Sequence, residues 1–361
     1  MRKIARHSWS GLLLALLLFT ACGSQEKESG PEGHFDESQN ILNIYNWEDY
    51  LLPELIKEFE AQEGIQVNLH TYLDEDDILA ALQSGLTDAD LVVVSDNIVE
   101  ALHRAKLVHP LDRTLLPHLR HVTSHPFYFT LPGDTLVTVP YLLGTVGVLV
   151  NRKYVPDNEN SWDVLWDPAH AGRIGMLGNS LDVIDAGCKA LGFSISTEDP
   201  QQLDMVRDSL LAQRPLLAGY FDAVAIMEKM VDEELHAAQL YSGDAMVAMQ
   251  DNPDLRYFVP REGTTLWVDC FVVPVRAAHA EAAMRFINFM HQPEVMARNA
   301  RYLRYQPVNT AAIKLLPESM RNAPELFPPR QVLERCETFR PINAEAMRQR
   351  LAIWSALRDM D

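Results

Sequence analysis

The stretch from residue 41 to residue 105 alternates short apolar runs with segments of helical periodicity, which limits the folds open to this chain. The apolar runs, which have the length and β-branched content of strands, are Ile41–Tyr45, Ile65–Tyr72 and Leu91–Val94. The segments that follow them, each with a helical pattern, are Pro53–Gln62, Asp76–Ser84 and Ile98–Ala105. This repeat predicts an α/β fold with an open, mostly parallel sheet that helices cover on both faces.

A second set of strands and helices follows Asn151. Its predicted strands are Ile174–Leu177, Leu216–Tyr220 and Ala245–Met249. The predicted helices beyond Asn151 are Asp182–Leu191, Glu281–Met290, Pro293–Asn299 and Asn343–Leu357. With 361 residues the chain is too long for one small core. We therefore expect two lobes.

Two extended stretches, Tyr141–Val150 and Val268–Val275, bracket the second set. Two extended crossings between α/β lobes form a hinge. The expected boundaries are residues 41–143 plus 274–318 for lobe 1 and residues 144–273 plus 319–361 for lobe 2. Ligands in such sheets bind beyond the carboxyl ends of the strands, where the lobes would meet.

The first residues have the features of a targeting segment. Arg2, Lys3 and Arg6 precede an apolar run, Leu12–Phe19, that is too short to span a bilayer. Small residues then lead to Cys22, as at a lipoprotein cleavage site. We expect residues 1–21 to be a signal peptide, Cys22 to carry lipid, and residues 22–40 to form a flexible polar tether. Plain secretion is the alternative, and the choice between inner and outer membrane stays open.

The formal net charge of −19 limits the partners of the folded part. Nucleic acid and anionic membrane surfaces would be repelled, so we expect no nucleic-acid partner and membrane attachment through the N-terminal lipid alone. The charge is compatible with a cationic ligand, although solubility alone would also explain it.

Metal sites, cofactors and catalysis find little support. Cys188, Cys270 and Cys336 form no CxxC pair, and one disulfide among them stays possible. The histidines that could approach one another are His109, His118, His121 and His125. Because cysteine and carboxylate partners are missing nearby, we expect no metal, no cofactor and no enzyme activity. A metal-dependent hydrolase that uses these histidines is the alternative, and stoichiometric zinc in the purified protein would support it.

Aromatic and acidic residues occur together in two places. Trp47, Glu48 and Tyr50 follow the first predicted strand, while Trp267 and Asp269 project from one side of another because the period of a strand is two. An alkyl diamine has charged ends that need carboxylates and an apolar middle that packs on rings. The patterns therefore suit such a ligand. The structural alternatives are packing of the two tryptophans at a core and, for Asp49, an N-cap of the next helix.

Seven motifs then resemble one family in order and spacing. They are IYNWEDY, DLVVVS, PYLLGTVGVLVN, SWDVLWDP, GDAMVAM, PREGTTLWVD and NTAA. Over residues 41–330 the chain resembles bacterial spermidine/putrescine-binding proteins, the receptors of polyamine ABC importers. The resemblance implies a two-lobed type II periplasmic-binding fold with the ligand between the lobes. The residues that match the family's binding positions are Trp47, Tyr50, Ser95, Asp182, Trp267, Asp269 and Tyr305.

The chain also departs from the family pattern. Asp251 stands where a tryptophan is usual, Asp254 stands where the acid follows it, and Glu48 replaces a serine or threonine. We include these three acids among the expected ligand contacts and expect a changed ligand preference. A simple turn is the alternative for Asp251 and Asp254, and a cap is the alternative for Asp182.

The resemblance implies a function. We expect a monomeric, lipid-anchored periplasmic protein that captures a putrescine- or spermidine-class cation for an inner-membrane ABC permease. A sensor of the same fold, which signals through a membrane-bound regulatory protein, is the alternative. Which polyamine binds stays open.

Overall fold

The computed structural model describes residues 40–72, 75–85, 87–122, 130–131 and 135–358. They belong to a compact unit that spans Ser38–Asp361. The expected signal peptide, the lipidation site Cys22, nearly all of the tether and His125 lie outside the described residues. Within the described ranges, no helix combines the length and the apolarity that a membrane crossing requires.

The predicted strand–helix repeat is confirmed at the start of the unit. Its elements are β1 (Ile41–Trp47), α1 (Pro53–Glu63), β2 (Gln66–Tyr72), α2 (Glu75–Ser84), β3 (Leu91–Ser95) and α3 (Asp96–Arg104). β3 is a β-branched run buried over its first four residues, as expected for a strand that is covered on both faces. β1 instead alternates between buried and half-buried positions.

The second set contains more helices than the sequence patterns predicted. Its elements are β7 (Ile174–Leu177), α4 (Ser180–Ala190), α5 (Pro200–Gln213), β8 (Leu217–Phe221), α6 (Ala223–Val231), β9 (Ala237–Tyr241), α7 (Ser242–Asp251) and β10 (Leu255–Phe258). The chain continues through α8 (Ala280–Met290), α9 (Pro293–Leu303), β12 (Gln306–Pro307), α10 (Thr310–Leu315), α11 (Glu318–Arg321), α12 (Arg330–Leu333) and α13 (Ala344–Arg358). The helices α5 and α6 and the strand β9 were not predicted.

In the described residues the main sheet is continuous and runs in the order β2-β1-β3-β11-β6-β9-β7-β8, with β10 and β12 also paired to β6. β1 is parallel to β2 and β3, and β7 is parallel to β8 and β9. The middle strands β6 (Thr138–Asn151) and β11 (Leu266–Val272) pair antiparallel with their neighbours. The sheet is therefore parallel toward both ends and antiparallel where the crossing strands lie.

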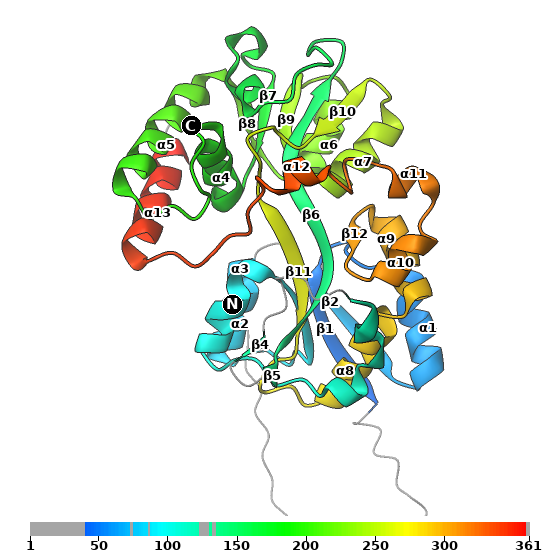
Figure 1. Ribbon diagram of the computed structural model, residues 1–361. Helices are drawn as coiled ribbons and strands as arrows, with labels where there is room; N and C mark the ends of the chain where they lie inside the picture. The colour runs from blue at the N-terminus through cyan, green and yellow to red at the C-terminus, as the bar shows by residue number, and fades with distance from the viewer. Residues whose placement is uncertain (1–39, 73–74, 86, 123–129, 132–134, 359–361) are drawn as a thin grey trace, which may run out of the picture. The chain divides into compact units, whose positions relative to one another are not determined.

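Two lobes form around separate cores, and β6 belongs to both. Tyr141 and Leu142 lie in the core that contains Phe59, whereas Val148 and Leu149 lie in the core that contains Trp162. We call these the first and second cores, and the elements around them the first and second lobes. Figure 1 shows β6 and β11 running from one group of elements to the other. These strands coincide with the two extended crossings expected from the sequence.

The helix α13 closes the second core. Its residues Ala346, Ile353 and Leu357 are buried there. Between them, the buried Arg350 donates a hydrogen bond to the Asp185 carboxylate on α4 at 2.9 Å and another to the Ile195 carbonyl. A buried ion pair thus joins the end of the chain to the middle of this lobe.

Two local predictions were wrong. Ala245–Met249 is part of the helix α7, not a strand: Ser242, Ala245 and Ala248 are buried at a spacing of three, while Val247 is exposed.

Asp49 does not cap α1, because the N-cap residue is Leu52 and makes no side-chain hydrogen bond. Asp49 instead has a positive φ of 52°, a conformation that aspartate tolerates better than most residues.

Candidate functional site

A series of aromatic rings connects the two cores. Trp267 on β11 and Tyr241 at the end of β9 pack against both cores. The ring centroid of Trp267 lies 6.3 Å from that of Tyr241 and 5.0 Å from that of Tyr305. The Tyr305 ring in turn lies 5.8 Å from that of Tyr50. The edge-to-face geometry is favourable for aromatic pairs, and the series forms an apolar wall between the lobes.

Glycines allow two of these rings to lie against the backbone. Gly144 on β6 is directly opposite Trp267, and a Cβ atom added there would overlap the indole. A Cβ atom added at Gly243 would likewise overlap the Tyr305 ring. Any larger residue at either position would displace a ring of this wall.

Three carboxylates of the first lobe approach one another where β3 and β11 meet. Asp269 is only 6% exposed and pairs in register with Ser95. The backbone N–H of Ser95 donates to Glu75 at 2.6 Å, and that of Val268 donates to Asp96 at 3.3 Å. Asp269 raises the pKa of both Glu75 and Asp96, and Asp96 raises that of Glu75, as like charges do at short range. The first lobe thus has three acidic groups close together beside the rings.

The second lobe supplies two more acids at the other side of the rings. Asp182 on α4 accepts a hydrogen bond from the Tyr241 hydroxyl at 2.7 Å. Asp244 on α7 interacts with the Tyr305 hydroxyl. The side chain that caps α4 is Asn179, so capping does not explain Asp182.

Burial raises the pKa of every one of these acids. The pKa is about 7 for Glu75, Asp96 and Asp182, and about 6 for Asp244 and Asp269, with desolvation as the largest cause in each case. No lysine or arginine side chain forms an ion pair with any of them in the part of the chain that the structure describes. A cationic ligand would supply the missing charge.

Two polar atoms in this region have no hydrogen-bond partner among the described residues. They are the indole N–H of Trp267 and the side-chain oxygen of Asn97, which follows Asp96. The Tyr50 hydroxyl lies beside Asp269. Burial raises the pKa of this hydroxyl most, and the charge of Asp269 raises it further. Since buried polar groups are nearly always paired, the two unpaired atoms mark a place for a ligand or ordered water.

The structure brings most of the expected site residues together. Those that lie in the cluster of rings and acids are Tyr50, Ser95, Asp182, Trp267, Asp269 and Tyr305. Trp47 borders it through Tyr72: their ring centroids are 4.5 Å apart, and the pKa of Tyr72 is raised by burial and by Glu75 and Asp269.

Three expected acids do not join the cluster. Glu48 is exposed and makes no ion pair within the described ranges. Asp251 is exposed at the last residue of α7. Asp254 pairs with Lys153 at 3.1 Å, and its backbone N–H bonds to the side chain of Asn252 at 3.0 Å, which is a turn interaction. The inclusion of these acids among the ligand contacts is therefore not supported by their positions.

Sequence reasoning missed several members of the cluster. They are Tyr72, Glu75, Asp96, Tyr241 and Asp244. Glu75 lies in the first turn of α2, where the helix dipole alone explains an acid, and β9 was not predicted, which hid Tyr241. The available signal was position: Tyr72, Asp96 and Tyr241 stand at or just after the carboxyl end of a strand, where ligands bind in such sheets.

The other candidate chemistry lies elsewhere. Cys188, Cys270 and Cys336 are free thiols, so the possible disulfide does not form. The rings of His118 and His121 stack with centroids 6.1 Å apart. In the described part of the chain, no three metal-binding side chains converge.

The raised pKa values predict that the ligand-free protein loses stability as the pH rises. The acids of the cluster bind protons more tightly in the folded state, so their contribution is full below about pH 4 and is lost as the pH passes 6 to 7. Because one pKa unit on one group is worth about 1.4 kcal/mol, we expect the unfolding free energy to fall by at least ~2 kcal/mol from pH 5.5 to pH 8. Urea denaturation at pH 5.5 and at pH 8 measures this difference in unfolding free energy.

The variant Glu75→Gln is the control for this prediction. It removes one acid whose pKa is raised by folding, so the unfolding free energy should depend less steeply on pH. An unfolding free energy that stays constant or rises from pH 5.5 to pH 8 would contradict the account of these acids.

Comparisons with known proteins show the family and the fold of the chain. The model of the family described as bacterial extracellular solute-binding protein matches residues 54–328. The chain is 27% identical over 338 residues to the putrescine-binding periplasmic protein SpuD of Pseudomonas aeruginosa, covering 88% of this chain and 92% of the relative. It is also 27% identical over 346 residues to the spermidine/putrescine-binding periplasmic protein of Escherichia coli, covering 95% of each.

A solved structure shows the same fold. It is that of a putative spermidine/putrescine ABC transporter from Listeria monocytogenes, with a TM-score of 0.82 and 30% identity. The match covers 89% of this chain and 100% of the other. The predicted two-lobed α/β fold is thereby confirmed.

Proposed function

The chain belongs to the family of bacterial extracellular solute-binding proteins, and on this premise we propose that it captures a polyamine between its two lobes. The relatives named above are putrescine- or spermidine-binding proteins of the periplasm. The observation that carries the proposal is the order of groups in the cluster: acids of the first lobe, a wall of rings, and acids of the second lobe. This order matches a molecule with cationic ends and an apolar middle.

Each part of such a ligand has a counterpart in the cluster. One ammonium group would bind Asp269, with Glu75 and Asp96 nearby, and another would bind Asp182 or Asp244. The methylene chain would pack on Trp267 and the neighbouring rings, at about 0.8 kcal/mol for each buried CH₂. Ammonium groups close to ring faces gain about 0.5–2 kcal/mol more.

The ligand would also compensate the like charges of the site. Without it, the buried acids hold protons that a diamine must displace when the carboxylates ionise. Binding should therefore release protons and strengthen as the pH rises toward 8, until the ammonium groups themselves lose protons near pH 10.

The same proposal extends to the biology of the chain. The first and second lobes, as defined above by their cores, would close as rigid bodies about β6 and β11. An ABC permease of the inner membrane would recognise and bind the closed form. The protein would act as a single chain in the periplasm, held at the membrane by lipid on Cys22.

A thermal-shift panel tests the polyamine assignment. Residues 23–361 are heated with putrescine, cadaverine, spermidine, norspermidine or agmatine at 1 mM. Ligand at about 100 times its Kd adds roughly 2.7 kcal/mol of stability, so at least one compound should raise the Tm by about 3–5 °C.

Butylamine and 1,4-butanediol are the controls, because they keep the four-carbon chain of putrescine but carry one charge or none. Neither should raise the Tm. Equal shifts with butylamine, or no shift with any polyamine, would contradict the proposal.

A further inference from the structure

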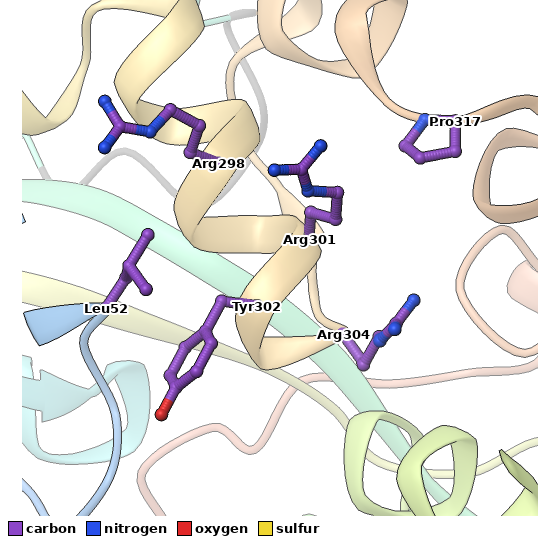
Figure 2. Close-up of a pocket in the computed structure, with 6 residues that line it drawn as sticks. All are labelled: Leu52, Arg298, Arg301, Tyr302, Arg304 and Pro317. Carbon is purple, nitrogen blue, oxygen red and sulfur yellow. The ribbon is translucent and has the colours of Figure 1, made fainter. Parts of the chain in front are cut away.

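A second candidate site lies on α9, away from the acids described above. A pocket of about 450 Å³ is lined by Leu52, Arg298, Arg301, Tyr302, Arg304 and Pro317. Figure 2 shows Arg298 and Arg301 projecting from α9 and Arg304 following at its end. A spacing of three residues places successive arginines on neighbouring parts of a helical surface. The volume is in the range of small-molecule sites.

The charge of this pocket is opposite to that of the molecule. The whole chain has a formal net charge of −19, yet none of the described residues that line the pocket is acidic. Three guanidinium groups around one pocket repel one another unless an anion or solvent screens them. The helix dipole favours basic residues near a helix C-terminus. This effect explains one arginine at the end of α9, but it does not explain three arginines around one pocket.

The arginines differ in how far their hydrogen-bonding capacity is used. Arg298 pairs with Glu58 at 2.6 Å, and Arg304 donates to the Gln250 side chain at 3.3 Å. Arg301 is exposed and has no hydrogen-bond or ion-pair partner within the described residues. Its planar fork therefore remains available for a bidentate contact, and these contacts of Arg298 and Arg304 use only part of the donor capacity of each guanidinium.

We propose that this pocket binds a small polyanion that carries phosphate groups. Arginine forks match the geometry of phosphate oxygens, and the exposed ring of Tyr302 with Leu52 and Pro317 supplies an apolar wall for the rest of the ligand. A free phosphate compound and a phospholipid headgroup share this chemistry. The site does not depend on the polyamine assignment.

The position of the pocket connects it to both lobes. Arg304 directly precedes Tyr305, whose ring belongs to the site between the cores. Its hydrogen bond to Gln250 reaches α7 of the second lobe. An anion on Arg304 would therefore lie where the two lobes touch.

Calorimetric titration with inorganic pyrophosphate at constant ionic strength tests the proposal. We expect one saturable site with a Kd below about 1 mM. The variant Arg301→Gln should weaken binding by about tenfold or more, since hydrogen bonds to charged groups are the strong ones. Arg348→Gln on α13, which is exposed and changes the charge equally, should bind as the unchanged protein does.

A parallel titration with phosphatidylglycerol vesicles identifies the source of the phosphate. Binding of vesicles that Arg301→Gln reduces supports a lipid headgroup, and binding of pyrophosphate alone supports a free compound. No saturable binding in either arm would overturn the proposal, as would equal losses in Arg301→Gln and Arg348→Gln. Thermal melts of both variants show whether they fold.

Discussion

The variant Asp269→Asn is expected to bind polyamines about a hundredfold more weakly, or not measurably. Asp269 is buried, stands between Tyr50 and Ser95, and has no cationic partner within the described part of the chain. Removing one partner of a buried charge pair costs about 3–5 kcal/mol, because the other charge stays desolvated and unpaired. Calorimetric titration at pH 7.5 with the compound that gives the largest thermal shift measures this loss.

Folding and binding can be separated in this variant. Replacing Asp269 removes a like charge next to Glu75 and Asp96, so the ligand-free protein should be as stable at pH 8 as before, or more so. Asp254→Asn is the matched control, because that carboxylate pairs with Lys153 outside the cluster. An unchanged affinity in Asp269→Asn, or an equal loss in Asp254→Asn, would refute the site.

The variant Arg350→Leu should lower the unfolding free energy by about 3–5 kcal/mol. The Arg350 side chain is buried, and its loss leaves the Asp185 carboxylate unpaired inside the second core. Burial already raises the pKa of Asp185 to about 6, although Arg350 lowers it in part. Without Arg350 this pKa rises further, and a protonated Asp185 would reduce the cost, so urea denaturation is measured at pH 8.

The control for this stability prediction is Arg348→Leu on the same helix. Arg348 is exposed, and among the described residues its one ion pair is with Glu345, so its loss should cost less than about 0.5 kcal/mol. If both variants unfolded at the same urea concentration, the ion pair between α13 and α4 would not hold the end of the chain in place.

The sequence was sufficient to predict the elements whose hydrophobic pattern is strong. The β-branched run of β3 and the periodic surfaces of α1 and α8 correspond to the observed elements within one or two residues. Short Ala- and Met-rich stretches were not predicted correctly. The segment Ala245–Met249 fits a period of two or of three, and only its burial in the second core makes it a helix.

The site residues also fall into those that the sequence predicted and those that it did not. Trp267 and Asp269 were found because their types and spacing carry the chemistry of a diamine. Glu75 was not found, because an acid in the first turn of a helix is ordinarily explained by the helix dipole. Asp244 was not found, because the segment that follows it was predicted to be a strand. Their roles depend on which element packs beside them, and that is a property of the tertiary structure.

A crystal structure of the protein with spermidine or putrescine tests the central claim most directly. We expect the ligand between the two lobes, with its chain against Trp267 and an ammonium nitrogen about 3 Å from an Asp269 oxygen. A second ammonium nitrogen should lie beside Asp182 or Asp244. A ligand bound elsewhere, with Trp267 and Asp269 free of contact to it, would contradict the account.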